Sequence, residues 1–213
     1  NCFMIRGTEH GEKYFVNEHG KKYEMEEFEQ KLPLLNLRQL MISKTLPDTI
    51  HGVEMDPHVV NSARSFFRYK PAAKNAPKPG LYPMFESESG RASLTMPTDF
   101  FQIKSRMEFI EAATNSVNEQ KTAKFTGALQ HFGFSFPAKM IEGIPTTRKS
   151  CDEGYFIVDN ADQVFHVKME QGEPYVRKVE IPSGLTFKHI ACVDFRNKAY
   201  YCYLIGHDNN IFI

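Results

Sequence analysis

The stretch from Tyr155 to Phe165, Tyr-Phe-Ile-Val-Asp-Asn-Ala-Asp-Gln-Val-Phe, sets the fold of the C-terminal part of the chain, because it holds two short apolar runs around an Asp- and Asn-rich turn. Parts of it recur without gaps 47 positions later: 156–158 match 203–205, and 162–165 match 209–212. A period of this size is typical of β-propeller blades, since each blade needs four short strands and their turns. Two similar hairpins in one open sheet would give the same pattern, so both interpretations stay open.

The pattern is strand-only from 151 onward, and we expect 151–213 to be an antiparallel β-repeat region resembling an incomplete β-propeller. Two repeats cannot close a ring. The chain begins at Asn1 rather than Met, and it stops inside the apolar run 210–213. We therefore expect both ends to continue in a longer protein and the repeat region to be truncated at its C-terminus.

Residues 1–150 are expected to form a mixed region of helices and hairpins, which assigns the whole chain to the α+β class. A hairpin is predicted over 14–23, and Asp56-Pro57 predicts the start of a short helix after an extended piece over 49–53. Between them, apolar residues at spacings of three and four predict a helix that Pro33 splits in two. All of these apolar residues are expected in the core: Met25, Phe28, Leu32, Leu35, Leu37, Leu40 and Met41.

The proline-rich stretch near 71–83 is predicted to be an exposed connection and a candidate boundary, with a strand over 66–69 before it. Hairpins are predicted over 84–94 and 100–110. From 118 to 132 one apolar face predicts a helix, and Gly133 follows where a left-handed cap is needed.

The composition excludes several classes of protein. Hydrophobic residues make up 41% and charged residues 24%, which is typical of folded globular chains. Lys plus Arg and Asp plus Glu number 26 each, so no net field attracts nucleic acid. No run is long and apolar enough to span a bilayer, and no signal peptide is recognisable.

The four cysteines are too scattered for a disulfide framework, and none forms a C-x-x-C pair. Cys192 and Cys202 face each other if the hairpin between them turns about Asn197, whereas a shift of one residue separates them. Two buried free thiols are the simpler interpretation, and their redox state stays open.

Motifs for phosphate loops, dinucleotide turns, zincins and nucleophile elbows are absent, so no catalytic residue or cofactor is predicted. The best metal-like cluster is His51, Glu54, Asp56 and His58, but Asp56 is needed as a helix cap and the others fit an exposed stretch. We rank this cluster as a weak candidate. Asp159–Asp162 lacks the Gly and Glu of a calcium loop and is predicted to be a hairpin turn.

Specific segments spread over nearly the whole chain are shared with one family: 14–35, 80–83, 86–91, 114–119, 134–139, 145–149, 152–155 and 195–197. In these segments the chain resembles an uncharacterised family of membrane-anchored envelope proteins of Gram-negative anaerobes. The resemblance implies a longer protein with membrane-spanning ends, a periplasmic or otherwise extracytoplasmic location for this segment, and a gene encoded beside those of transporter components. It implies no catalytic residue.

We therefore expect a binding or accessory module whose partner is another envelope or membrane protein, with no nucleic acid and no cofactor. Contact with the membrane is expected only through segments outside this chain. Two alternatives are a structural spacer and a hydrolase whose site gathers some of the His and acidic residues. The residues considered for the hydrolase are His51, Glu54, Asp56, His189 and His207.

Overall fold

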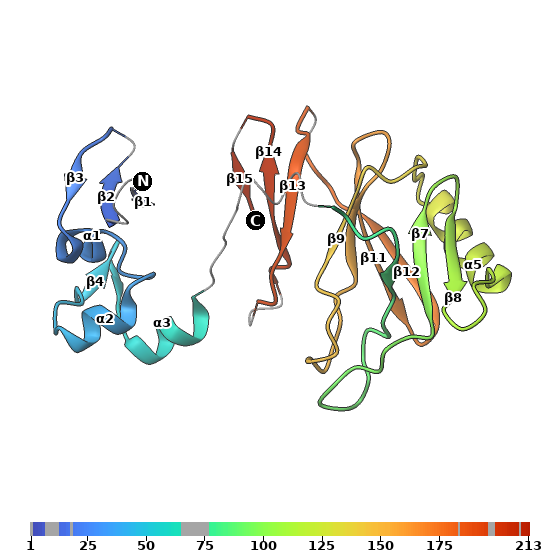
Figure 1. The fold of residues 1–213 in the computed structure, drawn as a ribbon, viewed down its shortest axis with the longest axis horizontal. Helices are drawn as coiled ribbons and strands as arrows, with labels where there is room; N and C mark the ends of the chain where they lie inside the picture. Colours follow the sequence, from blue (N-terminus) through green and yellow to red (C-terminus); the bar gives the residue numbers. More distant parts are fainter. Residues whose placement is uncertain are drawn as a thin grey trace. The chain divides into compact units, whose positions relative to one another are not determined.

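The computed structural model describes residues 2–6, 13–17, 19–64, 77–182, 184–195, 199–208 and 210–213. The chain divides into two compact units, 1–66 and 67–213 (Figure 1). The predicted boundary at 150 falls inside the second unit, because strands on either side of it pair with each other. The division falls instead beside the predicted proline-rich connection. Residues 71–76 of that connection and the strand predicted over 66–69 lie outside the described residues.

The first unit combines two small antiparallel sheets with short helices. The sheet β1-β2-β3 contains the predicted hairpin, and β4 and β5 form a second hairpin where a single extended piece was predicted. The elements are β1 (Cys2–Arg6), β2 (Lys13–Asn17), β3 (Lys22–Tyr23), α1 (Met25–Lys31), α2 (Leu37–Ile42), β4 (Thr49–Ile50), β5 (Val53–Glu54) and α3 (Pro57–Ala63).

The predicted core of this unit is partly wrong. Phe28 of α1 and both Leu37 and Leu40 of α2 are buried, and Phe28 packs against Phe15 with ring centroids 4.6 Å apart. The side chains of three other residues of the predicted stripe, Met25, Leu35 and Met41, are 59%, 55% and 46% exposed. The helices are too short to hold one continuous stripe, since α1 ends at Lys31 and Leu35 belongs to the connecting turn.

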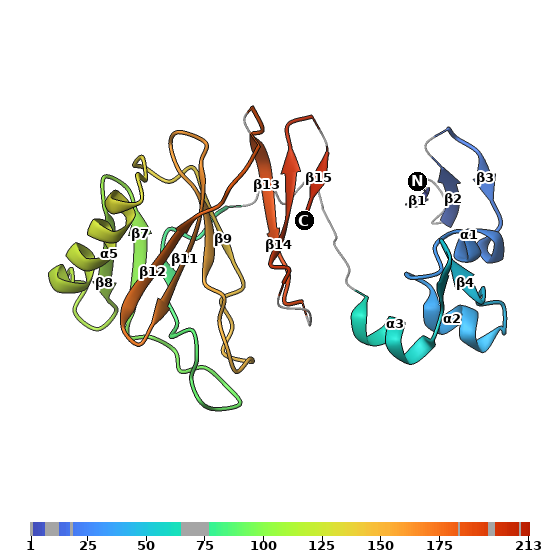
Figure 2. The ribbon, with the colours of Figure 1, turned by 180° about the vertical axis from the view of Figure 1, so that it is seen from behind.

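The second unit contains a long helix and three antiparallel sheets, which fits the α+β class (Figure 2). The predicted helix is α5, and Gly133 after it has φ +78°, as its cap requires. The elements are β6 (Tyr82–Pro83), β7 (Asp99–Ile103), β8 (Met107–Glu111), α5 (Glu119–His131), β9 (Met140–Gly143), β10 (Tyr155–Val158), β11 (Val164–Glu170), β12 (Glu173–Lys178), β13 (Phe187–Cys192), β14 (Cys202–Gly206) and β15 (Ile211–Phe212).

The sheet β12-β11-β10-β9 lies in the middle of this unit, and its inner strands β10 and most of β11 are buried on both faces. One face, with Ile157 and Phe165, packs against the sheet β6-β7-β8 and α5. The other face, with Phe156 and Val164, packs against the sheet β13-β14-β15 (Figure 1). The predicted hairpin over 84–94 does not form, because Glu86 and Glu88 make isolated bridges to Met169 and Cys151 instead of pairing with their own neighbours.

The 47-residue repeat is present in the backbone. Strands β13, β14 and β15 begin 47 positions after β9, β10 and β11, at 187, 202 and 211 against 140, 155 and 164. The cross-strand pairs Ile157–Phe165 and Val158–Val164 recur as Leu204–Phe212 and Ile205–Ile211. The two sheets are therefore successive copies of one antiparallel meander. Within the described residues they do not close into a barrel or a ring.

Candidate functional site

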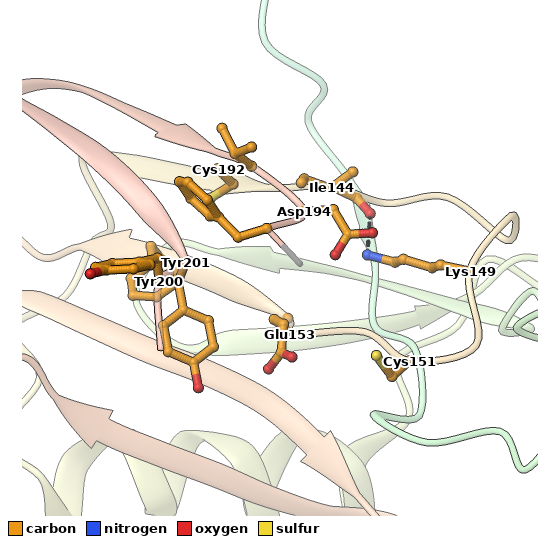
Figure 3. A pocket seen from close by; sticks show the side chains of 12 residues that line it. Ile144, Lys149, Cys151, Glu153, Cys192, Asp194, Tyr200 and Tyr201 are labelled. Atoms are coloured by element: carbon orange, nitrogen blue, oxygen red, sulfur yellow. Dashed lines mark hydrogen bonds between the residues drawn. The ribbon is translucent and has the colours of Figure 1, made fainter. Parts of the chain in front are cut away.

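A small pocket with both charged and apolar lining lies between two loops that correspond to each other in the repeat, and we call it the polar pocket after its charged side chains, Lys149, Glu153 and Asp194. One loop joins β9 to β10 and the other joins β13 to β14. Figure 3 shows Lys149, Cys151 and Glu153 from the first loop opposite Asp194, Tyr200 and Tyr201 from the second. The enclosed volume is about 20 Å³, which is enough for one water molecule. The pocket is therefore a small recess rather than a chamber for a substrate.

A buried ion pair fixes the first loop. The Lys149 ammonium lies 2.5 Å from Oδ1 of Asp152 and donates a hydrogen bond of 2.7 Å to the Ile144 carbonyl, shown dashed in Figure 3. The two side chains are only 12% and 2% exposed. Asp152 also accepts from the backbone N–H of Gly154, and its own N–H donates to the Ser87 carbonyl at 2.8 Å. Since both charges are partnered, this pair orders the loop and is not available as a catalytic acid or base.

The wall behind the pocket is a cluster of stacked rings. His166 of β11 lies parallel to Phe156 of β10 with centroids 4.6 Å apart, and Tyr201 approaches both. The Nε2 atom of His166 lies 2.5 Å from the Glu153 carbonyl. Burial lowers the pKa of His166, so its imidazole is held in the neutral form. A neutral ring that already uses Nε2 serves packing better than proton transfer.

Gly154 connects the loop to β10 and passes very close to the neighbouring strand. Its φ is +71°, and a Cβ atom at this position would lie 2.2 Å from the Val167 carbonyl oxygen. Only glycine satisfies both conditions. The shape of the polar pocket therefore depends on this residue.

Cys192 and Cys202 are directly opposite each other in the β13–β14 pair, which is the facing arrangement considered from the sequence. Both are free thiols. Burial raises the pKa of Cys192 well above its usual range and that of Cys202 to about 12. Because the thiolate is the nucleophile, neither sulfur is activated for catalysis.

An apolar cavity of about 390 Å³ adjoins the polar pocket and shares Phe156, Tyr200 and Tyr201 with it. Its other walls come from the segment after β12, from β14 and from β15, chiefly Val179, Ile181, Leu185, Leu204 and Phe212. Its volume falls in the range of ligand-binding cavities, about 300–1,000 Å³. The polar pocket and the apolar cavity therefore adjoin at Phe156, Tyr200 and Tyr201 and form one continuous candidate surface.

The residues considered from the sequence lie elsewhere. Asp56 caps α3, accepting from the N–H groups of His58 and Val59 at 2.7 and 3.2 Å, as predicted. His51 lies in the β4–β5 turn and Glu54 ends β5. Across the described ranges no three His, Cys, Asp or Glu side chains are grouped to hold a metal ion.

The residues considered for a hydrolase are split between the two units. His51, Glu54 and Asp56 belong to the first, whereas His189 in β13 and His207 after β14 belong to the second. None of these five lines the polar pocket or the apolar cavity. Asp159 forms the predicted hairpin turn, accepting from the N–H groups of Ala161 and Gln163 at 2.8 Å each.

Sequence reasoning missed Lys149, Asp152 and His166. The first two are three positions apart in an irregular loop, where no periodicity distinguishes them from solvated charges. One signal was available in the repeat, because it places the β9–β10 and β13–β14 loops at corresponding positions, and hence at the same end of two stacked sheets.

Comparison with known proteins gives one match. A family model described as Domain of unknown function (DUF4857) matches residues 1–213. No curated protein and no solved structure matches significantly. In the part of the chain that is described, no helix is long and apolar enough to cross a membrane. Since the family match spans the whole sequence, the chain belongs to the DUF4857 family of domains of unknown function.

Proposed function

We propose that this chain is a binding module whose recognition surface is the polar pocket together with the apolar cavity. One observation carries the proposal: the two hollows share Phe156, Tyr200 and Tyr201, and both open between corresponding elements of two stacked sheets. Loops on a rigid scaffold are the usual place for recognition. The central sheet supplies such a scaffold, because β10 is buried along its whole length.

Binding is favoured over hydrolysis by the state of the groups at this surface. The thiols of Cys192 and Cys202 have raised pKa values, and His166 is neutral with Nε2 beside the Glu153 carbonyl. Lys149 is paired with Asp152. A nucleophile beside a base that is free to take its proton is the arrangement a hydrolase needs, and these groups do not supply it.

The partner we propose is another envelope or membrane protein, met on the extracytoplasmic side by a membrane-anchored form of this chain. The family resemblance supports the location and the association with transporter components. The repeat supports a propeller-like architecture in which these two meanders are neighbouring blades, since blades stack face to face as these sheets do. A structural spacer is the competing role, and it requires no specific contact at this surface.

Site-specific photo-crosslinking tests the proposal. A photoreactive phenylalanine analogue replaces Tyr200, which is 44% exposed and lines both hollows, in the protein as produced in its native membranes. A matched position is Ala123 on the exposed side of α5. We expect one discrete crosslinked product from position 200 and none from position 123. Equal or absent products from both positions would show that the surface is not a recognition site.

A further inference from the structure

Cys192 and Cys202 form one cross-strand pair, and the hydrogen bond beside it shows which kind of pair this is. The Val193 N–H donates to the Tyr201 carbonyl at 3.1 Å, so Val193 and Tyr201 are a hydrogen-bonded pair. Hydrogen-bonded and non-hydrogen-bonded pairs alternate along an antiparallel ladder. Cys192 and Cys202 come directly before them in the ladder and are therefore a non-hydrogen-bonded pair, in which facing side chains lie closest.

The backbone of this pair has the separation that a disulfide needs. Non-hydrogen-bonded partners have Cα atoms about 4.5 Å apart, and disulfides join Cα atoms about 4.4–6.8 Å apart. Both side chains also point to the same side of their sheet, because Cys202 is buried in the apolar cluster between the two sheets and Cys192 packs against that cluster. The two sulfurs can therefore be joined while the register of β13 and β14 is kept.

The two sulfurs differ in their surroundings. Cys192 is partly exposed and lines the polar pocket, whereas Cys202 is 7% exposed and lines the apolar cavity. The Cys192 thiol donates a hydrogen bond of 3.4 Å to the Glu142 carbonyl of β9. Since a thiol is a weak donor, little stability is lost when this sulfur turns from Glu142 to Cys202. Cys192 is thus the sulfur that an outside reagent reaches first.

We propose that Cys192 and Cys202 are an oxidation site, where a disulfide of low molecular weight closes them into a cross-strand disulfide between the polar pocket and the apolar cavity. The Cys192 thiolate attacks the outside disulfide and forms a mixed disulfide, which releases one thiol. The Cys202 thiolate then attacks the Cys192 sulfur, and the second thiol leaves. The protein loses two electrons and two protons, and the outside disulfide takes them up as two thiols.

The closed disulfide fixes the base of the loop between β13 and β14, which presents Asp194, Tyr200 and Tyr201 to the polar pocket. Burial raises the pKa of both thiols, so attack is slow near neutral pH and becomes faster as the pH rises. A thiol of high pKa is also a poor leaving group, so the disulfide resists reduction once it is closed. The disulfide forms whether or not the polar pocket and the apolar cavity bind a partner.

Oxidation of the whole chain by oxidised glutathione tests the proposal, with alkylation of the remaining thiols in denaturant and peptide mapping by mass spectrometry. We expect two fewer alkylated cysteines than after dithiothreitol, and one pair of peptides joined through Cys192 and Cys202. Cys192→Ala and Cys202→Ala should each abolish this product. Cys151→Ala is the matched control and should form the disulfide as the parent does, since Cys151 also lines the polar pocket but bridges to Glu88 rather than to a cysteine.

The oxidised chain should also unfold at a urea midpoint roughly 1 M higher than the reduced chain, because the disulfide restricts the segment 192–202 in the unfolded state. Three results would overturn the inference: every thiol is alkylated after oxidation, the disulfide joins Cys2 or Cys151 instead, or both forms unfold at the same midpoint because the bond strains the strand pair. None of these results changes the crosslink expected at position 200, so failure of the oxidation site is distinguishable from failure of the proposed function.

Discussion

Replacing Gly154 by alanine is expected to lower the free energy of unfolding of the second unit by about 2–5 kcal/mol. A left-handed backbone costs a residue with a Cβ roughly 1–2 kcal/mol, and overpacking adds about 1–3 kcal/mol. The overpacking is severe here, because the new Cβ would lie 2.2 Å from the Val167 carbonyl oxygen and 2.6 Å from Cβ of Lys168. Neither atom is the far end of a flexible side chain, so a strand has to move.

Gly172, in the turn between β11 and β12, is the matched control. Its φ is +77°, close to that of Gly154, but a Cβ there meets nothing within 4 Å. Gly172→Ala should therefore lower the free energy of unfolding only by the cost of the left-handed backbone, about 1–2 kcal/mol. The difference between the two variants isolates the cost of the close approach between the β9–β10 loop and β11.

Urea unfolding followed by near-ultraviolet circular dichroism of the tyrosines measures both variants, and hydrogen exchange of the β10 amides reports on the second unit separately from the first. With a slope of about 1–3 kcal/mol per molar urea, the midpoint for Gly154→Ala should fall by roughly 1 M or more. If Gly154→Ala and Gly172→Ala are equally stable, the loop is not confined as described, and the dependence of the polar pocket on Gly154 is refuted.

Two further perturbations address the wall and the turn near the site. Burial lowers the pKa of His166 below its unfolded value of about 6.5, so the folded state holds fewer protons and stability falls as the pH drops below that value, by at most about 1.4 kcal/mol per pH unit for one proton. His166→Phe should lose less stability between about pH 7 and about pH 5 than the parent, and equal losses in urea unfolding would contradict this. Asp159→Ala should lower the free energy of unfolding by about 3 kcal/mol, because the N–H groups of Ser135, Ala161 and Gln163 lose the buried carboxylate that accepts from them. Asp159→Asn keeps one acceptor oxygen, so thermal unfolding should show a smaller loss of stability than for Asp159→Ala. Equal losses for the two variants would show that these hydrogen bonds do not stabilise the turn.

The parts of the fold that the sequence predicted are those where one local signal dominates. The hairpin β7–β8, the helix α5 with its Gly133 cap, and the 47-residue repeat all follow from periodicity and turn residues. The exposure of Met25 and Met41 was not predictable in this way, because a stripe of apolar residues does not show how long each helix runs or how small the unit's core is.

The candidate site was largely out of reach of the sequence. The spacing of Lys149 and Asp152 in an irregular loop says nothing about their burial, which comes from packing against Ser87 and the end of β9. In the sequence of β11, His166 stands between apolar residues, which is the pattern of a strand residue that faces solvent. Its burial comes from packing against Phe156 and Tyr201, which the sequence does not reveal. Asp56 was predictable, because its role is local to one helix terminus.

From His189 to Cys192, after a β-bulge that follows Phe187, the pairing of β13 with β14 is displaced by two residues from that of β9 with β10. Tyr155 pairs with Gly143, whereas its counterpart Cys202 pairs with Cys192, two positions past the counterpart of Gly143. Because a strand's side chains alternate, the slip of two leaves the side chains of 189–192 on their original side of the strand, whereas the β-bulge between Phe187 and His189 moves Phe187 into the same apolar cluster as Ile190. The meander can thus exchange one connecting segment for another of different length while its stacking stays intact. The loops that line the polar pocket can therefore change in length and sequence without any change in how the two sheets pack.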